Sequence, residues 1–267
     1  MRKKMESRDL LRLVICSDLR KNILICLKED KKSLGNLRNE LNISSTTAIH
    51  ALRELEKSNL AFQDRDKNYA LTKIGRILTL KVADFSNAVD VLKKYERFWL
   101  EHDLTGIPEH LMEKIGWLKD SNIVQIDSLD IIKTHESFVR FIKGAKWLKG
   151  VSPIFSADYP LIFTEMIERN VNTQAIVTDA VLKKTIDAFG KENFDKLISK
   201  YQLDLSVIDE NLKVAFTVTD GFLSIGLFTN NGLYDPTHDL ISTDNKAIQW
   251  GNELFEYYRG KAKKYEK

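Results

Sequence analysis

The order of short apolar patterns in the first 80 residues constrains the fold of this chain more than any other feature. Apolar residues recur at helical spacing over residues 8–28, 33–41 and 45–58, with only a few residues between them. Residues 60–65 then alternate between apolar and polar side chains, and residues 69–71 are typical of a return strand. Helices joined by a tight turn and followed by a β-hairpin predict a winged helix-turn-helix.

Capping residues mark the expected starts of these helices. Asp18 is expected to begin the second helical segment, and Ser33 the short helix that follows it. Ser44 and Ser45 are expected to begin the third helix of the helix-turn-helix, and Thr72 the helix after the hairpin.

One face of the helix at residues 45–58 is expected to contact DNA. Ala48, Leu52 and Leu55 share the other face and point toward a core. A helix in the major groove reads bases and phosphates with short polar and basic side chains near its N-terminus. We therefore expect contacts to double-stranded DNA from Ser45, Thr46, Thr47, His50 and Arg53, and from Arg65 and Lys67 at the tip of the hairpin.

These side chains suit different parts of the duplex. Ser45 and Thr46, beside the helix N-terminus, suit phosphate oxygens, and Arg53 suits either a guanine edge or a phosphate. Arg65 and Lys67 suit the DNA backbone or the minor groove. The same residues would also suit an ordinary solvated surface. A winged helix that binds another protein of a transcription complex, and not DNA, is the open alternative.

The distribution of charge agrees with a nucleic-acid-binding module at the N-terminus. Residues 1–80 contain 17 Lys and Arg against 10 Asp and Glu, whereas residues 81–267 contain 24 against 28. A basic third followed by a mildly acidic remainder is what such a module fused to a second domain would show.

A long helical pattern follows the hairpin, from residue 72 to about residue 100. It exceeds the mean helix length of about 11 residues. Its apolar stripe suits either packing within one chain or a dimer interface, since two DNA half-sites require two recognition helices. We expect residues 1–80 to bind DNA, residues 81–104 to form a linker or dimerisation helix in a homodimer, and residues 105–267 to sense an effector.

The C-terminal two thirds alternate between strand and helix patterns, which predicts an α/β domain with a mixed sheet and an α+β class for the whole chain. Strands are expected at residues 123–126, 147–151, 173–177, 204–208, 214–219 and 222–228. Asp220 and Gly221 predict a hairpin turn between the last two strands. Helices are expected at residues 108–118, 130–143, 158–169, 179–188, 190–200 and 242–264.

A small-molecule site is expected at the carboxyl ends of these strands, where open α/β sheets bind their ligands. Polar side chains follow three of the expected strands and lie near aromatic ones. We expect an effector to contact Ser152, Asp158, Thr178, Tyr234, Asp235 and His238. For residues 235–239 a capped turn without a ligand is the alternative.

None of the sought motifs for catalysis or cofactor binding occurs in the sequence. There is no G-x-G-x-x-G, P-loop or G-x-S-x-G pattern, and the histidines and cysteines show no zinc-ligand spacing. His102 lies in a charged segment that is expected to be a solvated helix end. We therefore expect no enzyme activity, no cofactor and no metal site.

The same sequence gives expectations about the compartment. No stretch of 18 apolar residues predicts a membrane span, and the N-terminus lacks the apolar region of a secretion signal. Cys16 and Cys26 lie among apolar residues and are expected to be buried thiols in a reducing environment. A cytoplasmic protein is expected.

Segments across the whole chain resemble the archaeal, methanogen-type winged helix-turn-helix transcription regulators whose C-terminal sensor domain is of the filament-regulator, or methanogenesis regulatory, type. In the N-terminal third the matching segments are residues 55–60, the hairpin and residues 69–75. In the remainder they are residues 148–155, 158–163, 212–220, 222–228, 234–235, 239–242 and 250–259. The resemblance implies a DNA-binding regulator with a C-terminal effector or dimerisation domain.

A weaker resemblance links the C-terminal domain to phospholipase-D-like sensor domains that are fused to archaeal winged helices. It rests on residues 220–226 and on the last helix. The H-x-K signature of the active phospholipases is missing from this sequence, so this resemblance implies a shared fold without the chemistry.

Overall fold

The computed structural model describes residues 6–125, 144–156, 164, 166, 169–200 and 203–266. The chain divides into two compact units, Met1–Asn87 and Ala88–Lys267, which we call the N-terminal unit and the C-terminal unit. The helix expected at residues 130–143 lies outside the described residues, and so does most of the helix expected at residues 158–169.

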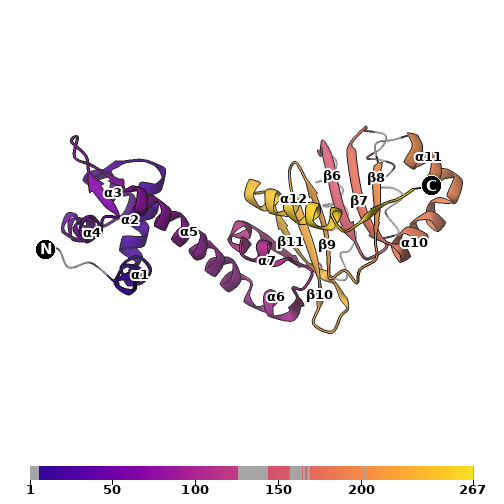
Figure 1. The fold of residues 1–267 in the computed structure, drawn as a ribbon, viewed down its shortest axis with the longest axis horizontal. Helices are drawn as coiled ribbons and strands as arrows, with labels where there is room; N and C mark the ends of the chain where they lie inside the picture. Colours follow the sequence, from indigo (N-terminus) through magenta and orange to yellow (C-terminus); the bar gives the residue numbers. More distant parts are fainter. Residues whose placement is uncertain are drawn as a thin grey trace. The chain divides into compact units, whose positions relative to one another are not determined.

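The N-terminal unit has the element order of a winged helix-turn-helix (Figure 1). Its helices are α1 (Ser7–Ile15), α2 (Asp18–Glu29), α3 (Leu34–Leu41), α4 (Ser45–Lys57) and the first part of α5 (Lys73–Lys94). Strands β1 (Lys32–Ser33), β2 (Ala61–Gln63) and β3 (Asn68–Leu71) form an antiparallel sheet in the order β1-β3-β2. The predicted helices and hairpin are confirmed, whereas β1 is too short to give a pattern in the sequence.

Three of the expected helix caps are present. The hydroxyl oxygens of Ser33, Ser44 and Thr72 accept hydrogen bonds from backbone N–H groups at 3.2, 3.1 and 2.9 Å. The prediction for Asp18 is wrong, because Ser17 caps α2 by accepting from a backbone N–H in the first turn at 3.4 Å. Asp18 is the first residue of α2, where its charge lies near the positive end of the helix dipole.

The inward face of α4 lies in the core of the N-terminal unit. Ala48, Leu52 and Leu55 are fully buried, as predicted, and Ala51 is buried with them. The core around α4 consists of Val14, Ile23, Leu24, Leu27, Leu37, Leu60, Ala61 and Tyr69. Because α4 buries only this one face, its polar side chains are left on the outside of the unit.

The long helix predicted for residues 72–100 is broken near its end. Tyr95, whose backbone angles (φ −126°, ψ 36°) are not helical, separates α5 from the short helix α6 (Glu96–Glu101). After the break, Phe98 and Trp99 are buried in the core of the C-terminal unit. Burial of these two large aromatic side chains stabilises the position of α6.

The described strands of the C-terminal unit form one nine-stranded mixed sheet. Its strand order is β12-β8-β7-β6-β9-β10-β11-β5. The ninth strand, β4, is outside this order and pairs with β10. The strands are β4 (His102–Asp103), β5 (Asn122–Gln125), β6 (Trp147–Ser152), β7 (Asn172–Thr178), β8 (Leu203–Ile208), β9 (Val214–Thr219), β10 (Leu223–Thr229), β11 (Tyr234–Ser242) and β12 (Lys263–Lys264). The β6–β7 and β7–β8 pairs are parallel, and the other described pairs of this sheet are antiparallel.

Helices cover both faces of this sheet (Figure 1). α12 (Asn245–Arg259) packs on one face, together with α7 (Glu109–Met112) and a 3₁₀ turn at Ile115–Leu118. α10 (Asp179–Phe189) and α11 (Lys191–Lys200) pack on the opposite face of β7 and β8. Across the described part of the chain, no helix is long and apolar enough to span a bilayer.

The main differences from prediction lie near the end of the chain. β11 is a strand of nine residues, whereas a capped turn had been one of the two alternatives for residues 235–239. α12 ends at Arg259, where residues 242–264 had been expected to be helical, and the chain continues into the edge strand β12. The helix predicted at residues 108–118 is divided into α7 and the 3₁₀ turn.

The prediction that both cysteines are buried is wrong. Cys16 is exposed at the end of α1, and Cys26 is only half-buried. Burial, and to a lesser degree Glu40, raises the pKa of the Cys26 thiol to about 11. At neutral pH Cys26 therefore remains a thiol with low reactivity.

The backbone of Leu60 packs so closely against Gly75 that a substitution at Gly75 tests the packing of the N-terminal unit. A Cβ atom at Gly75 would lie 1.8 Å from the carbonyl oxygen of Leu60, so Gly75→Ala must displace backbone. We expect it to destabilise the unit by about 2 kcal/mol or more, measured by thermal unfolding of the full chain with circular dichroism. Gly35→Ala, at an exposed position in α3 with no atom closer than 3.8 Å, should stabilise by about 0.5 kcal/mol. Equal melting temperatures for the two variants would contradict this packing.

Candidate nucleic-acid interface and effector site

The outer face of α4 collects the side chains that were predicted to contact DNA. Thr46, Thr47, His50 and Arg53 are exposed, and Ser45 is half-buried at the helix start. Their arrangement follows from the burial of the opposite face of α4 in the core. A row of hydroxyl, imidazole and guanidinium groups along one exposed helix face can donate to phosphates and to base edges.

The start of α4 is held by a local hydrogen-bond network. The Ser44 hydroxyl accepts from the backbone N–H of Thr47 at 3.1 Å and lies 2.7 Å from the Thr47 hydroxyl. Thr47 therefore has a structural role at the helix start besides any contact with DNA. The remaining free N–H groups of the first turn give this end a partial positive charge, which favours an anion such as phosphate.

The hairpin between β2 and β3 presents the two other predicted residues. Arg65 and Lys67 are exposed, and Lys67 has a left-handed backbone (φ 59°) that closes the turn. The carboxylate of Asp64 accepts from the backbone N–H of Asn68 at 2.8 Å and from the ammonium of Lys31 at 3.1 Å. These bonds lower the pKa of Asp64, and they fix the tip from which Arg65 and Lys67 project.

Arg20 on α2 joins α1 to α4, and the sequence pattern did not identify it. Its Nε donates to the carbonyl of Leu13 at 2.7 Å, and a terminal guanidinium nitrogen lies 2.6 Å from the carboxylate of Glu54. A hollow of about 310 Å³ lies beside this pair, lined by Ser17, Leu19, Arg20, Thr46, Thr47, His50, Ala51 and Glu54. The exposed polar face of α4 is thus continuous with a concave surface toward α2.

The predicted effector residues fall into two groups. Ser152 and Thr178 end the neighbouring parallel strands β6 and β7. The Ser152 hydroxyl donates to the carbonyl of Ile154 at 2.7 Å, and the Thr178 hydroxyl caps α10. Asp158 lies outside the described residues. The other group is on β11, and strands β9 and β10 separate it from β6.

The β11 group is organised around the carboxylate of Asp235. One carboxylate oxygen accepts from the hydroxyl and the backbone N–H of Thr237 at 2.5 and 2.8 Å. The other oxygen lies 2.9 Å from Nδ1 of His238 and 3.1 Å from Nε2 of His102. Burial raises the pKa of Asp235, but these hydrogen bonds outweigh it and lower the pKa from 3.8 to about 2. Asp235 is therefore ionised at neutral pH.

His102 is the residue of this group that the sequence analysis placed wrongly. Its side chain is 4% exposed, whereas a solvated helix end had been expected. The reason is the sheet, because β4 pairs with β10 and carries His102 to Asp235, which lies 133 residues further along the chain. The two adjacent aromatic residues Phe98 and Trp99 were the signal in the sequence that the chain enters the core just before His102, and both are buried in the structure.

Tyr234 and Asp239 complete the polar face of β11. The Tyr234 ring packs edge-on against Phe228 with 5.5 Å between centroids, and its hydroxyl lies over Gly226, where a Cβ atom would be 2.3 Å away. Burial raises the pKa of Asp239, a hydrogen bond from Ser224 opposes this, and the charge of Asp235 raises the pKa further. A Cβ atom at position 226 would therefore displace the side chain of Tyr234 or the carboxylate of Asp239.

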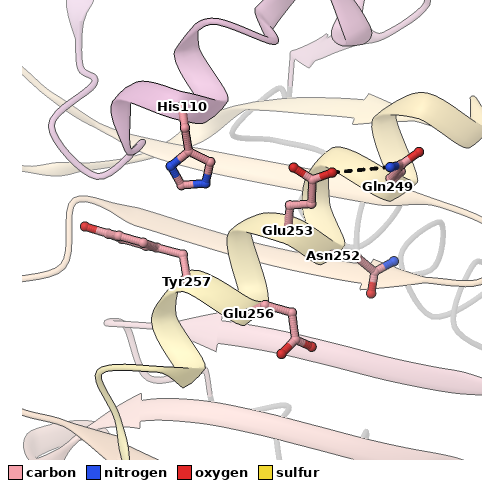
Figure 2. Close-up of a pocket in the computed structure, with 6 residues that line it drawn as sticks. All are labelled: His110, Gln249, Asn252, Glu253, Glu256 and Tyr257. Atoms are coloured by element: carbon pink, nitrogen blue, oxygen red, sulfur yellow. Dashed lines mark hydrogen bonds between the residues drawn. The ribbon is translucent and has the colours of Figure 1, made fainter.

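A second hollow, of about 420 Å³, lies between α7 and α12 (Figure 2). Its lining consists of His110, Gln249, Asn252, Glu253, Glu256 and Tyr257. Both carboxylates already have cationic partners, since Lys114 lies 2.5 Å from Glu253 and Lys149 lies 3.0 Å from Glu256. None of the predicted effector residues lines this hollow. Within the residues that the structure describes, no cluster of three acidic, histidine or cysteine side chains could hold a metal ion.

Two family models match the chain. The N-terminal domain of the methanogenesis regulatory protein FilR1 matches residues 8–90, and the middle domain of that protein matches residues 131–261. The methanogenesis regulatory protein FilR1 of Methanothrix harundinacea (strain 6Ac) is 30% identical over 261 residues, which cover 95% of this chain and 58% of the relative. The chain thus spans little more than half the length of that relative.

Solved structures show more distant likenesses. TrmBL2, an archaeal chromatin protein described as having a novel mode of DNA binding, is 15% identical with a TM-score of 0.42, over 96% of this chain and 97% of that chain. A phosphatidylserine synthase from Haemophilus influenzae Rd KW20 is 12% identical with a TM-score of 0.41, over 54% and 40% of the two chains. The repressor AdcR from Streptococcus pyogenes is 13% identical with a TM-score of 0.26, over 48% and 79%. These TM-scores are too low to support a functional argument.

The charge of Asp235 should stabilise the C-terminal unit in a pH-dependent way. Because the pKa is lower in the folded chain, the stabilisation is complete well above the ordinary pKa of 3.8 and is lost as the pH falls toward 2. Asp235→Asn should therefore lower the free energy of unfolding by roughly 2 kcal/mol at pH 7, with a smaller effect below about pH 4. Urea unfolding followed by tryptophan fluorescence measures this, since all four tryptophans lie in the C-terminal unit. Asp187→Asn, at an exposed position, is the control, and an equal effect of both would contradict the role of Asp235.

Proposed function

The chain belongs to the family of archaeal transcription regulators that includes the methanogenesis regulatory protein FilR1, and we propose that it binds duplex DNA through α4 and the β2–β3 hairpin. The observation that carries this proposal is the exposed polar face of α4, with Thr46, His50 and Arg53 in one row. An α-helix fits the major groove, which is about 12 Å wide, and the row would then face base edges and phosphates.

Electrostatics support the same surface. The N-terminal 80 residues carry 17 basic and 10 acidic side chains, and the basic residues Arg53, Arg65 and Lys67 of the proposed interface are all exposed. Exposed basic side chains attract the phosphate backbone and release its counterions on binding. In this proposal residues 1–80 are the DNA-binding domain.

A homodimer is the second part of the proposal. α5 carries large apolar side chains in the N-terminal unit that remain exposed, with Ile77 at 63%, Leu80 at 50% and Phe85 at 58%. Large apolar side chains exposed along one helix, here called the apolar strip, mark an interaction surface. A second copy of the chain is the occupant that we propose, because two half-sites of an operator require two recognition helices.

The C-terminal unit is proposed to respond to an effector or a partner. β9 runs antiparallel to both β6 and β10, so the carboxyl ends of β6, β7 and β10 lie at the same edge of the sheet, where β11 begins. Ser152, Thr178 and Tyr234 are at that edge, and Asp235 and His238 follow on β11. A coupling of about 1–3 kcal/mol between this site and DNA would give roughly 5–150-fold control.

DNA binding should depend steeply on salt and on the two basic positions. For Arg53→Ala combined with Lys67→Ala, we expect roughly tenfold or greater loss of affinity for a mixed-sequence duplex, and a shallower slope of log affinity against log salt by about 1–2. Fluorescence anisotropy of a labelled duplex at several salt concentrations measures both quantities.

The matched control for this variant removes the same charge elsewhere. Lys191→Ala combined with Lys246→Ala changes two exposed lysines of the C-terminal unit and should leave affinity and slope unchanged. If the wild-type chain shows a flat salt dependence, or if Arg53→Ala with Lys67→Ala binds DNA as tightly as wild type, the DNA-binding proposal fails. A winged helix that binds a protein of a transcription complex would then be favoured.

The dimer can be tested at α5. Ile77→Glu combined with Leu80→Glu places two carboxylates in the exposed apolar strip, where burial against a second copy would require their desolvation. We expect light scattering to give the mass of two chains for wild type and of one chain for the variant. Leu233→Glu, at a position 71% exposed in the C-terminal unit, should remain a dimer. A wild-type chain that is monomeric at micromolar concentrations would contradict the dimer.

A further inference from the structure

The exposed polar face of α4 carries different side chains at its two ends. Thr46, His50, Arg53 and Lys57 are all exposed, and their spacing of i, i+4, i+7 and i+11 places them in one row opposite the buried face. At a rise of 1.5 Å per residue, this row is about 16 Å long. Lys57, which ends the row, was not among the residues predicted to contact DNA.

The length of the row decides which of its side chains can reach bases. A straight helix stays in the major groove for only part of its length, because the groove winds around the duplex. Recognition helices contact base edges with residues near their N-terminus. His50 lies in the second turn of α4 and would face base edges, whereas Arg53 and Lys57 would lie where the helix leaves the groove and meets the sugar-phosphate backbone.

The β2–β3 hairpin supports this direction of the helix. It follows the C-terminal end of α4 after only a few residues. Burial raises the pKa of Tyr69 on β3, the charge of Glu56 raises it further and the charge of Arg53 lowers it, so Arg53 lies near the hairpin. Because Arg65 and Lys67 at the hairpin tip are expected at the DNA backbone, Arg53 extends the same backbone-contacting surface.

The charges of Arg53 and Lys57 are available to phosphates. Neither takes part in the ion pairs of the N-terminal unit, which in the described part of this unit involve the basic residues Arg20, Lys21, Lys28, Lys31 and Lys32. The carboxylate of Glu54, on the side of α4 toward α2, is held by Arg20 at 2.6 Å. A phosphate oxygen can therefore bind Arg53 and Lys57 without displacing a carboxylate from either of them.

His50 has the chemistry to distinguish one base from the others. An imidazole carries at least one ring N–H whether it is neutral or protonated, so it can always donate a hydrogen bond. In the major groove guanine presents two acceptors, N7 and O6, whereas adenine presents one acceptor beside a donor amine. The hydroxyl of Thr46 can contact several bases or a phosphate, so it carries less sequence information.

We propose that His50 is the specificity-determining residue of the DNA-binding surface and selects guanine, while Arg53 and Lys57 hold phosphates and add affinity without sequence preference. This inference rests on the proposed DNA binding. It divides the exposed row of α4 into a part that reads bases and a part that holds the backbone.

Selection from a library of duplexes with a randomised central segment tests the reading role in the full chain. For wild type we expect the enriched duplexes to share a guanine at the position that His50 contacts. For His50→Gln we expect adenine at that same position and no change elsewhere, because a glutamine amide pairs with N6 and N7 of adenine. His50→Ala should reduce the preference for guanine by roughly fivefold or more, with an unchanged salt dependence. A purely structural role of His50 would not exchange one base for another.

Lys57→Ala tests the holding role. We expect affinity to fall for every duplex by the same factor, roughly five- to tenfold near 0.1 M salt, because one phosphate contact is lost. The slope of log affinity against log salt should become shallower by about 1, and the enriched sequence should stay that of wild type. Fluorescence anisotropy with the selected duplex and with a scrambled duplex measures these quantities.

Matched controls change the same residue types in the C-terminal unit. His110→Gln and Lys246→Ala alter exposed side chains there and should keep the wild-type sequence preference and salt slope. If His50→Gln selects the same bases as wild type, if Lys57→Ala changes the selected base, or if wild type binds duplexes without any preference, the inference is wrong and the DNA-binding proposal stands. A wild-type chain that binds no duplex would overturn the DNA-binding proposal and this inference together.

Discussion

The burial of one face of α4 is the interaction on which the N-terminal unit and its proposed function depend. Leu52 and Leu55 are fully buried against α2 and the β-hairpin, and this fixes the rotation of the helix about its own axis. With that rotation fixed, Thr46, His50 and Arg53 have to face outward. Arg20 on α2 adds a second constraint, because its bonds to Leu13 of α1 and to Glu54 of α4 connect these three helices.

Local periodicity made most of the fold predictable. α3, α4 and the hairpin have strong patterns and cap residues. β9 consists almost entirely of β-branched and aromatic residues, and β6, β7 and β10 contain shorter apolar stretches. β11 was not predictable in the same way, because Pro236 and several polar residues interrupt the apolar alternation over residues 234–242. Its pairing with β10 also shifts register between Gly226 and Phe228, which no local pattern reveals.

The two candidate sites differed in how far sequence could define them. All residues of the exposed polar face of α4 lie in one helix, so the periodicity of one sequence segment is sufficient to identify them. The group around Asp235 is a property of the sheet, since His102 and Asp235 are 133 residues apart and meet only because β4 and β11 both pair with β10. For the same reason Ser152 and Tyr234, which follow equivalent patterns in the sequence, are separated by two strands.

The most direct test of the account is to map where duplex DNA contacts the chain. Backbone amide chemical shifts of the full chain can be followed during titration with a mixed-sequence duplex at low salt and again at high salt. The account predicts that the largest changes lie in residues 44–53 of α4 and residues 64–68 of the hairpin, and that high salt removes them. Changes confined to the C-terminal unit, or absent from α4, would contradict it.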